Sequence, residues 1–269
     1  VDCSGRADMA ERYEGWLAQG IHVVTPSKHA GSGDAARLAA LHRAGAKSGA
    51  RFRYEATVGA GLPVVMTLRN LIDTGDVPRS IAGLFSGTLA WLFNHYDGSR
   101  PFSELLAEAR AAGYTEPDPR DDLSGTDVAR KAVILAREAG WSLSLDQVDV
   151  ENLVPYQLRE VPLPEFLQRL GEFDAPMAER LAAAKAQGQV LRYLAEVDAT
   201  GTATVALRAV DATHPAASAQ GTDNLFAFHT ARYHTRPLVV KGPGAGPDVT
   251  AAGVFGDILA IAAHLGAKL

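Results

Sequence analysis

The segment from Gly113 to Lys131 combines many charged residues with a rigid turn and an apolar helical run. Its charged residues are Glu116, Asp118, Arg120, Asp121, Asp122, Asp127, Arg130 and Lys131. Charges packed against an apolar helix cost free energy unless they are paired or take part in chemistry. The turn Pro117-Asp118-Pro119 restricts the backbone and fixes the direction of the charges around it. The pattern therefore predicts a substrate pocket rather than a solvated face.

Asp127 and Lys131 are four residues apart, a spacing that places both side chains on one face of a helix. A surface ion pair of this kind contributes about 0.3–0.5 kcal/mol and requires no function. A lysine poised by carboxylates can also carry a proton to or from a substrate. Because the acids of residues 116–122 lie just upstream, we favour the second interpretation.

The excess of carboxylates between Glu116 and Asp127 allows three interpretations. Clustered carboxylates bind hard cations, although this spacing does not match an EF-hand loop. They also suit the ammonium group of a small amino acid, which we favour. The third interpretation is a solvated turn whose acids cap helices. Ser124 followed by Asp127 has the pattern of a capping box.

Two glycine-rich turns, Gly59–Pro63 and Gly242–Gly246, each lead into a predicted helix. Each could bring the backbone close to a phosphate or an ion. The second has the spacing Gly-x-Gly-x-Gly and is followed by one helix only, so it cannot start a βαβ unit. We therefore reject it as a dinucleotide fingerprint and keep only a close approach to a cofactor.

The composition restricts the class of protein. The chain has 269 residues, of which 47% are hydrophobic, enough for one large domain or two small ones. Its net charge is -5 without a cluster of basic residues, which argues against nucleic acids and anionic membranes as partners. The single cysteine, Cys3, allows no internal disulfide and favours a reducing, cytoplasmic setting. No apolar run approaches the roughly 18 residues of a membrane span.

Hydrophobic periodicity predicts an α/β fold. Helices are expected at 7–19, 34–45, 62–72, 87–95, 102–112, 127–139, 163–170, 177–186 and 249–264. Early strands are expected at 21–25 and 52–56, and later ones at 190–197, 203–210, 225–229 and 237–241. The early part predicts a parallel sheet, beyond whose strand ends Lys28 and Glu55 would lie. The later part predicts a sheet rich in antiparallel pairs.

Several segments together resemble homoserine dehydrogenase, and the resemblance extends over the whole chain. They are Tyr54–Pro63, Ser86–Leu89, Tyr114–Lys131, Val239–Gly246 and Asp248–Val254. The details Trp91-Leu92-Phe93 and Asp97-Gly98-Ser99 are most similar to the dehydrogenase half of bifunctional aspartokinase/homoserine dehydrogenases. The resemblance implies NAD(P)-dependent, reversible reduction of L-aspartate 4-semialdehyde to L-homoserine, a step in threonine and methionine biosynthesis.

The resemblance also implies roles for the charged residues of the pocket. Lys131 matches the family's catalytic lysine, which exchanges a proton with the substrate oxygen. Glu116 and Asp127 match residues that hold the substrate, and Asp122 lies in the same pocket. Lys28 matches the lysine between nicotinamide and substrate. Its motif reads Thr25-Pro26-Ser27-Lys28, with Ser27 where the family usually has asparagine.

Further positions are implied for the cofactor and for a cation. Ser4, Gly113 and Gly246 match positions close to the cofactor, NADP or NAD. Glu55 matches a residue of a monovalent-cation site, usually for sodium, which also uses the backbone of Val58, Ala60 and Leu62.

The resemblance divides the chain into two regions. Residues 1–52, completed by 247–269, correspond to part of a Rossmann-type nucleotide-binding domain with a parallel sheet. Residues 53–246 correspond to an α+β catalytic and dimerisation domain with a mixed sheet. A homodimer or higher homo-oligomer is implied, as is a possible fused aspartokinase domain. In the family, a phosphate-binding glycine loop precedes the part that this sequence matches, and the sequence does not contain it. The alternative to an active enzyme is therefore a catalytically inert substrate-binding and dimerisation fragment.

Overall fold

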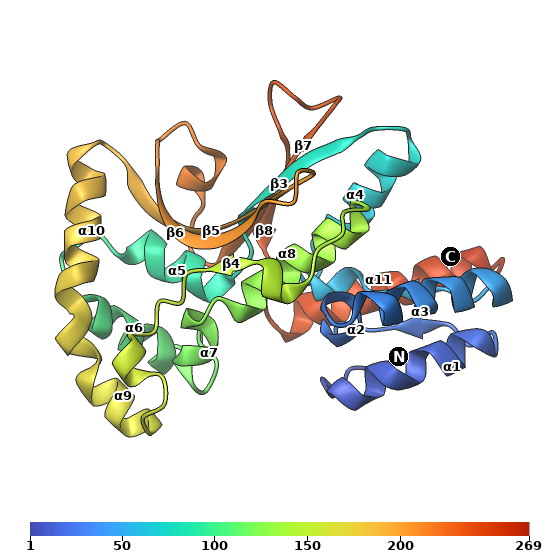
Figure 1. Ribbon diagram of the computed structural model, residues 1–269, viewed down its shortest axis with the longest axis horizontal. Helices are drawn as coiled ribbons and strands as arrows, with labels where there is room; N and C mark the ends of the chain where they lie inside the picture. Colours follow the sequence, from blue (N-terminus) through green and yellow to red (C-terminus); the bar gives the residue numbers. More distant parts are fainter. Residues whose placement is uncertain (269) are drawn as a thin grey trace.

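The computed structural model describes residues 1–268 and contains two sheets (Figure 1). In the smaller sheet, β1 (Val23–Val24) pairs with β2 (Phe52–Arg53) in parallel. It is flanked by η1 (Ala7–Arg12), α1 (Tyr13–Ala18), α2 (His29–Ser32) and α3 (Ala35–Ser48). Tyr13, Leu17 and Leu41 are fully buried between these elements. This small core holds β1 in place, and therefore also the loop after β1 that carries Lys28.

The larger sheet has six strands in the order β4-β6-β5-β3-β7-β8. The strands are β3 (Pro78–Leu84), β4 (Asp149–Val150), β5 (Val190–Asp198), β6 (Ala203–Val210), β7 (Asp223–Thr230) and β8 (Leu238–Pro243). All neighbouring pairs are antiparallel except β4 with β6. The sheet is therefore mixed, and β3 lies near its centre.

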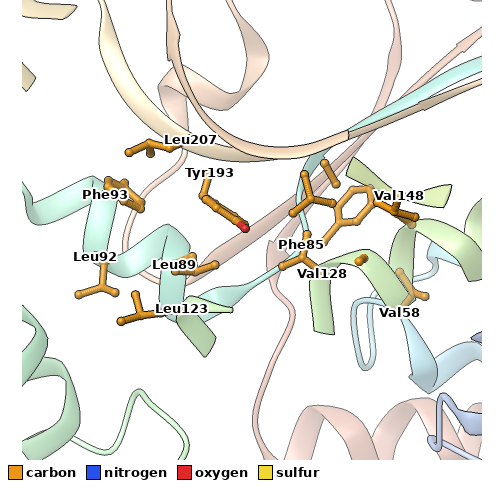
Figure 2. Close-up of a cluster of buried hydrophobic side chains, with 14 of the residues drawn as sticks. Val58, Phe85, Leu89, Leu92, Phe93, Leu123, Val128, Val148, Tyr193 and Leu207 are labelled. Atoms are coloured by element: carbon orange, nitrogen blue, oxygen red, sulfur yellow. The ribbon is translucent and has the colours of Figure 1, made fainter. Parts of the chain in front are cut away.

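Helices pack against the larger sheet and with it enclose the main core. They are α4 (Val64–Asp73), α5 (Gly87–His95), α6 (Phe102–Ala111), α7 (Pro119–Leu123), α8 (Thr126–Glu138), α9 (Leu163–Arg169) and α10 (Asp174–Ala186). Figure 2 shows part of this core, with side chains such as Leu89 of α5, Val128 of α8 and Tyr193 of β5 directed toward one another. Phe85, just after β3, stacks on Phe226 with ring centroids 4.7 Å apart. Val128 and the other buried residues of α8 belong to this core, which holds α8 against β5 and β6.

The last helix, α11 (Pro247–His264), returns to the first part of the chain. Figure 1 shows it in the part of the molecule that contains both termini. Val254 and Ile261 pack with Val24 of β1 and with Ala56 of η2 (Glu55–Thr57). The glycine-rich turn before α11 is thereby brought toward the ends of β1 and β2. No helix within residues 1–268 is long and apolar enough to cross a membrane.

The predicted α/β class with a parallel and a mixed sheet is confirmed, but several local predictions are wrong. The central strand β3 was not predicted, because its short sequence begins with proline and contains Gly83, both unusual in strands. The strand predicted for 52–56 ends at Arg53 and continues as the 3₁₀ turn η2. The helix predicted from residue 7 begins as the 3₁₀ turn η1.

The capping box predicted at Ser124 and Asp127 is also wrong. Ser124 adopts helical angles at the end of α7, and the N-cap of α8 is Gly125, with φ of +72°. The Ser124 hydroxyl donates to the Asp121 carbonyl and accepts the Thr126 N–H. The two helices thus meet at a glycine turn, which leaves the Asp127 carboxylate free to pair with cationic side chains.

Candidate active site

Asp127 forms ion pairs with two lysines that come from different parts of the fold. Its Oδ2 lies 2.9 Å from Nζ of Lys131, one turn further along α8, and its Oδ1 lies 3.1 Å from Nζ of Lys28. Lys28 follows β1 and caps α2. The loop after the small sheet and the helix beside the large sheet therefore meet at one carboxylate.

The Lys131 side chain is held by two acceptors. Its Nζ donates to the Phe85 carbonyl at 2.7 Å in addition to its contact with Asp127. Only 12% of the side chain is exposed, so the ammonium group is fixed at the wall of the site. An ammonium group has three N–H donors. One donor therefore remains for a ligand after the two contacts with the protein.

The electrostatics of this cluster keep Asp127 ionised. Partial desolvation by the surrounding protein would by itself raise the pKa of Asp127, but the Lys131 and Lys28 ammonium groups outweigh it and hold the pKa below its usual range. A carboxyl group with a lowered pKa loses its stabilising contribution only as the pH falls toward that lowered value. The two ion pairs therefore persist throughout the neutral pH range.

A cavity of about 600 Å³ opens beside this cluster. It brings together Lys28, Glu116, Asp122, Asp127, Lys131 and Gly246, with Ala60 at one wall. The other residues predicted for the site lie outside the cavity lining; they are Ser4, Glu55, Val58, Leu62 and Gly113. The carboxyl ends of the parallel strands, α8, the acidic segment and the late glycine turn thus converge on one space.

The acids of residues 116–122 have different environments. Asp122 accepts the Glu116 N–H at 2.8 Å, which fixes the backbone at Glu116. Burial raises the pKa of Asp122, and the neighbouring Glu116 and Asp127 charges act in the same direction. Asp118 instead caps α7 and pairs with Arg120. The cavity therefore receives an acidic wall from Glu116 and Asp122, while Asp118 stabilises the turn.

The backbone before Lys28 is held by a buried network. The Thr25 hydroxyl donates to the Asp2 carbonyl at 2.8 Å and accepts the Ser27 N–H at 3.0 Å. Tyr13, which is fully buried, donates its hydroxyl to the Asp2 carboxylate. This network restricts the loop that carries Lys28, because its polar groups have no access to water.

A smaller hollow of about 220 Å³ shares Lys28 and Asp127 with the lining of the large cavity. Cys3 and Gly5 line it, with Ser4 between them in the chain. Ser27 also lines it, and its buried hydroxyl has no hydrogen-bond partner within residues 1–268. A buried polar atom without a partner suggests a ligand or water contact.

The two glycines predicted to approach a cofactor have different positions. Gly246 lines the large cavity just before α11, with φ of +118°, a conformation that other residues rarely adopt. Gly113 follows α6 with φ of +75°, and a Cβ there would have no heavy atom within 4 Å. The turn at Gly246 thus provides bare backbone to the cavity, whereas Gly113 serves a helix end.

Glu55 begins η2, outside the cavity lining, and its side chain reaches the N-terminus of α4. Its carboxylate accepts the N–H groups of Val65 at 2.9 Å and Met66 at 2.8 Å. Burial raises its pKa to about 7, and the nearby Asp257 carboxylate acts in the same direction. Ala60, with φ of +52°, places its carbonyl 2.5 Å from where a Cβ on Gly253 would lie. Within residues 1–268, no group of three or more His, Cys, Asp or Glu side chains forms a metal-binding cluster.

Sequence reasoning missed one group that holds Lys131 and assigned no role to two charged residues of the cavity lining. The Phe85 carbonyl, which holds Lys131, is a backbone group that follows the unpredicted strand β3. Asp121 and Arg130 also line the cavity. The two charged residues belong to the acidic segment itself, so their proximity was detectable, whereas the Phe85 carbonyl has no side-chain signature.

Two family models match the chain, in agreement with its two regions. The model described as "Homoserine dehydrogenase, NAD binding domain" matches residues 1–55, and "Homoserine dehydrogenase" matches residues 63–259. The first match contains β1, Lys28 and α2, and the second contains the acidic segment and α8. The Lys28–Asp127 contact therefore joins the two matched parts. The exact domain limits predicted from sequence stay a prediction.

Known proteins that are similar to this chain indicate the same family as the two family models. Bifunctional aspartokinase/homoserine dehydrogenase 1, chloroplastic, of Arabidopsis thaliana is 52% identical over 99% of this chain and 30% of its own length. The homoserine dehydrogenase of Schizosaccharomyces pombe is 44% identical over the whole chain and 73% of its own length. A hyperthermophilic archaeal homoserine dehydrogenase solved with NADPH has a TM-score of 0.73 at 25% identity, covering 100% of this chain and 71% of that one.

The chain spans about 30% of the length of the bifunctional plant relative and about three quarters of the fission yeast enzyme. The second family model alone matches well over half of the 269 residues. By these matches, the chain belongs to the homoserine dehydrogenase family.

Proposed function

We propose that this chain supplies the catalytic site for the reversible, NAD(P)-dependent conversion of L-aspartate 4-semialdehyde to L-homoserine. The observation that carries this proposal is the Asp127 carboxylate, which holds Lys28 and Lys131 together at the wall of a cavity with further acids. Homoserine-dependent reduction of NADP by the purified full-length protein is the experiment that tests it.

Lys131 is the proton carrier in this proposal. As the aldehyde oxygen of the semialdehyde gains negative charge, an ammonium group within hydrogen-bond reach stabilises it and donates a proton. The contacts with Asp127 and Phe85 leave one N–H of Lys131 for that oxygen. Fixing the donor before the reaction avoids reorganisation in the transition state.

Glu116 and Asp122 bind the charged end of the substrate. Both line the cavity, and the Glu116 N–H is fixed by the Asp122 carboxylate. A carboxylate wall suits the α-ammonium group of homoserine, because charge-assisted hydrogen bonds are among the strongest in proteins. Holding that end sets the reacting carbon at a defined place.

The cofactor is NAD or NADP, which supplies or accepts the hydride when bound. The hollow beside Lys28 fits a nicotinamide carboxamide, since the buried Ser27 hydroxyl there has no other partner within residues 1–268. Ser4 adjoins the same hollow, and Gly246 offers bare backbone to the cavity. The archaeal relative solved with NADPH supports the same cofactor class.

Replacing Glu116 by glutamine is expected to raise KM for homoserine about tenfold or more, with a smaller change in kcat. The amide keeps the shape but loses the charge that attracts the substrate ammonium group, and a hydrogen bond to a charged group is worth about 1.5–3 kcal/mol. Steady-state kinetics measure both constants. Glu160→Gln, at an exposed position outside the cavity lining, is the control. An unchanged KM in Glu116→Gln would count against this role.

A monovalent cation, sodium above all, is proposed at Glu55 together with the carbonyls of Val58, Ala60 and Leu62. Carboxylate and carbonyl oxygens are suitable ligands for hard cations. The raised pKa of Glu55, about 7, and the adjacent Asp257 carboxylate make this place unfavourable for a second negative charge. A bound cation would offset that cost.

The pH dependence of sodium binding follows from the same pKa. Without a cation, the folded chain retains a proton at Glu55 that the unfolded chain releases near 4.5, so stability declines as pH rises toward about 7. Sodium competes with that proton. Sodium chloride, relative to tetramethylammonium chloride at equal ionic strength, should therefore raise Tm more at about pH 8 than at about pH 6. Thermal unfolding of the wild type and Glu55→Gln measures this, and an equal sodium effect in the variant would refute the site.

A homodimer and, in the full-length protein, a fused aspartokinase domain are further proposals. The plant relatives support the fused domain, because they are bifunctional aspartokinase/homoserine dehydrogenases. Sedimentation of the full-length protein would determine the oligomeric state.

A further inference from the structure

Arg137, near the end of α8, fastens α8 to the short helix that follows Lys28. Its Nη1 donates to the Gly31 carbonyl at 2.8 Å and to the Gly33 carbonyl at 2.7 Å. Its Nε donates to the Leu143 carbonyl at 2.9 Å. One planar guanidinium group thus ties together three carbonyls from α2 and from the loop after α8.

The helix α2 is a rigid link between Arg137 and Lys28. The Lys28 carbonyl accepts both the N–H of Ser32, at 2.9 Å, and its hydroxyl, at 2.8 Å. In the middle of the turn, Gly31 lies so close to α8 that a Cβ there would be 2.9 Å from the Ile134 side chain. The absence of a Cβ at Gly31 therefore allows α2 to lie directly on α8.

Both ends of α2 are fixed to the same face of α8. Four residues of α8 lie on one side of the helix, because they follow one another at spacings of four, three and three residues. They are Asp127, Lys131, Ile134 and Arg137. At one end Asp127 contacts Lys28, and at the other Arg137 holds Gly33. The position of Lys28 relative to Lys131 is therefore set by α2 lying along α8.

We propose that Arg137 is a positioning residue that sets the distance of Lys28 from Asp127 and Lys131, and so aligns the cofactor part with the substrate part. This inference rests on the proposed function, because the alignment has a purpose only if hydride passes between the two parts. Arg137 lies outside the lining of the large cavity, so it acts through α2 and not on the substrate.

Arg137→Lys tests this role, because lysine keeps the charge but lacks the planar fork needed to reach separate carbonyls. In the full-length protein, kcat is expected to fall about 10- to 100-fold, since a displacement near 1 Å can cost about 100-fold. KM for homoserine should stay within about twofold, because Glu116 and Asp122 are untouched. The deuterium isotope effect on kcat, measured with homoserine deuterated at C4, should rise as hydride transfer becomes rate-limiting.

The matched control is Arg180→Lys. Arg180 on α10 also donates to a backbone carbonyl, that of Leu207, and pairs with Glu151, but it lies outside both hollows. It should lose stability without changing kcat or the isotope effect. If Arg137→Lys behaves like this control, Arg137 has a purely structural role and the proposal is wrong. Gly31→Ala provides a second variant, because its Cβ would push α2 away from Ile134, and it should show the same fall in kcat.

Hydrogen exchange separates this inference from the proposed function. The amides of Ser32 and Gly33, which donate to Lys28 and His29 carbonyls, should exchange about tenfold faster in Arg137→Lys. Suppose that exchange is faster in Arg137→Lys but the wild type does not turn over homoserine. The proposed function would then be refuted, while the role of Arg137 in holding α2 would stand. Normal turnover with unchanged exchange and unchanged kcat in Arg137→Lys would refute the inference alone.

Discussion

Lys131→Ala in the full-length protein is expected to lower kcat for homoserine oxidation by about 10²–10⁴-fold, the usual contribution of a positioned general acid or base. The alanine variant has no ammonium group to exchange a proton with the substrate oxygen, and a water in the place between Asp127 and the Phe85 carbonyl would carry no positive charge to stabilise that oxygen. KM should change much less, because the acids that bind the ammonium end remain. Steady-state kinetics in both directions of the reaction measure the loss.

The control for this variant is Lys185→Ala. Lys185 also donates from Nζ to a backbone carbonyl, that of Asp97, but it lies on α10 outside the cavity lining. Its removal should leave kcat within about twofold, the range of an ordinary surface change. An equal loss of kcat in the two variants would contradict the assignment of Lys131.

Asp127→Asn is expected to have the second largest effect, a fall in kcat of about 100-fold or more. The amide has nearly the same shape, but it leaves the Lys28 and Lys131 ammonium groups without the carboxylate between them. Their mutual repulsion should displace both from their present positions. Because the Asp127 side chain is 49% exposed, the accompanying loss of folding stability should be small, and thermal unfolding checks this.

A double-mutant cycle shows whether Asp127 acts through Lys131. If the two residues form one unit, the variant carrying both substitutions should be little worse than Lys131→Ala alone. Two losses that multiply would show that Asp127 acts separately. Glu165→Gln breaks another i,i+4 pair, with Arg169, at a distance from the cavity and should leave kcat unchanged.

Residue spacing predicted the local part of this site, whereas Lys28 was placed in it only by the family resemblance. The spacing of Asp127 and Lys131 fixes their contact, since a helix places such residues on one face. The bridge from Asp127 to Lys28 joins residues about one hundred positions apart, and it depends on α2 lying on α8. No periodicity in either segment contains that information.

The fold shows the same division. Helices with clear periodicity, such as α5 (Gly87–His95), were predicted with the correct limits. The central strand β3 (Pro78–Leu84) was missed, because its pairing with β5 and β7 overrides a weak local preference. The Phe85 carbonyl was missed with it. The roles assigned to the site residues stay predictions until the kinetics above are measured.

Transfer of deuterium from homoserine to the cofactor tests the central claim most directly. The full-length protein is incubated with NADP and with L-homoserine that carries deuterium at C4, and the reduced cofactor is analysed by mass spectrometry. We predict that the wild type forms NADPH that contains one deuterium. Lys131→Ala should form almost no labelled NADPH. NADPH formed by the wild type without deuterium would contradict the account. So would a wild type that binds NADP but does not reduce it.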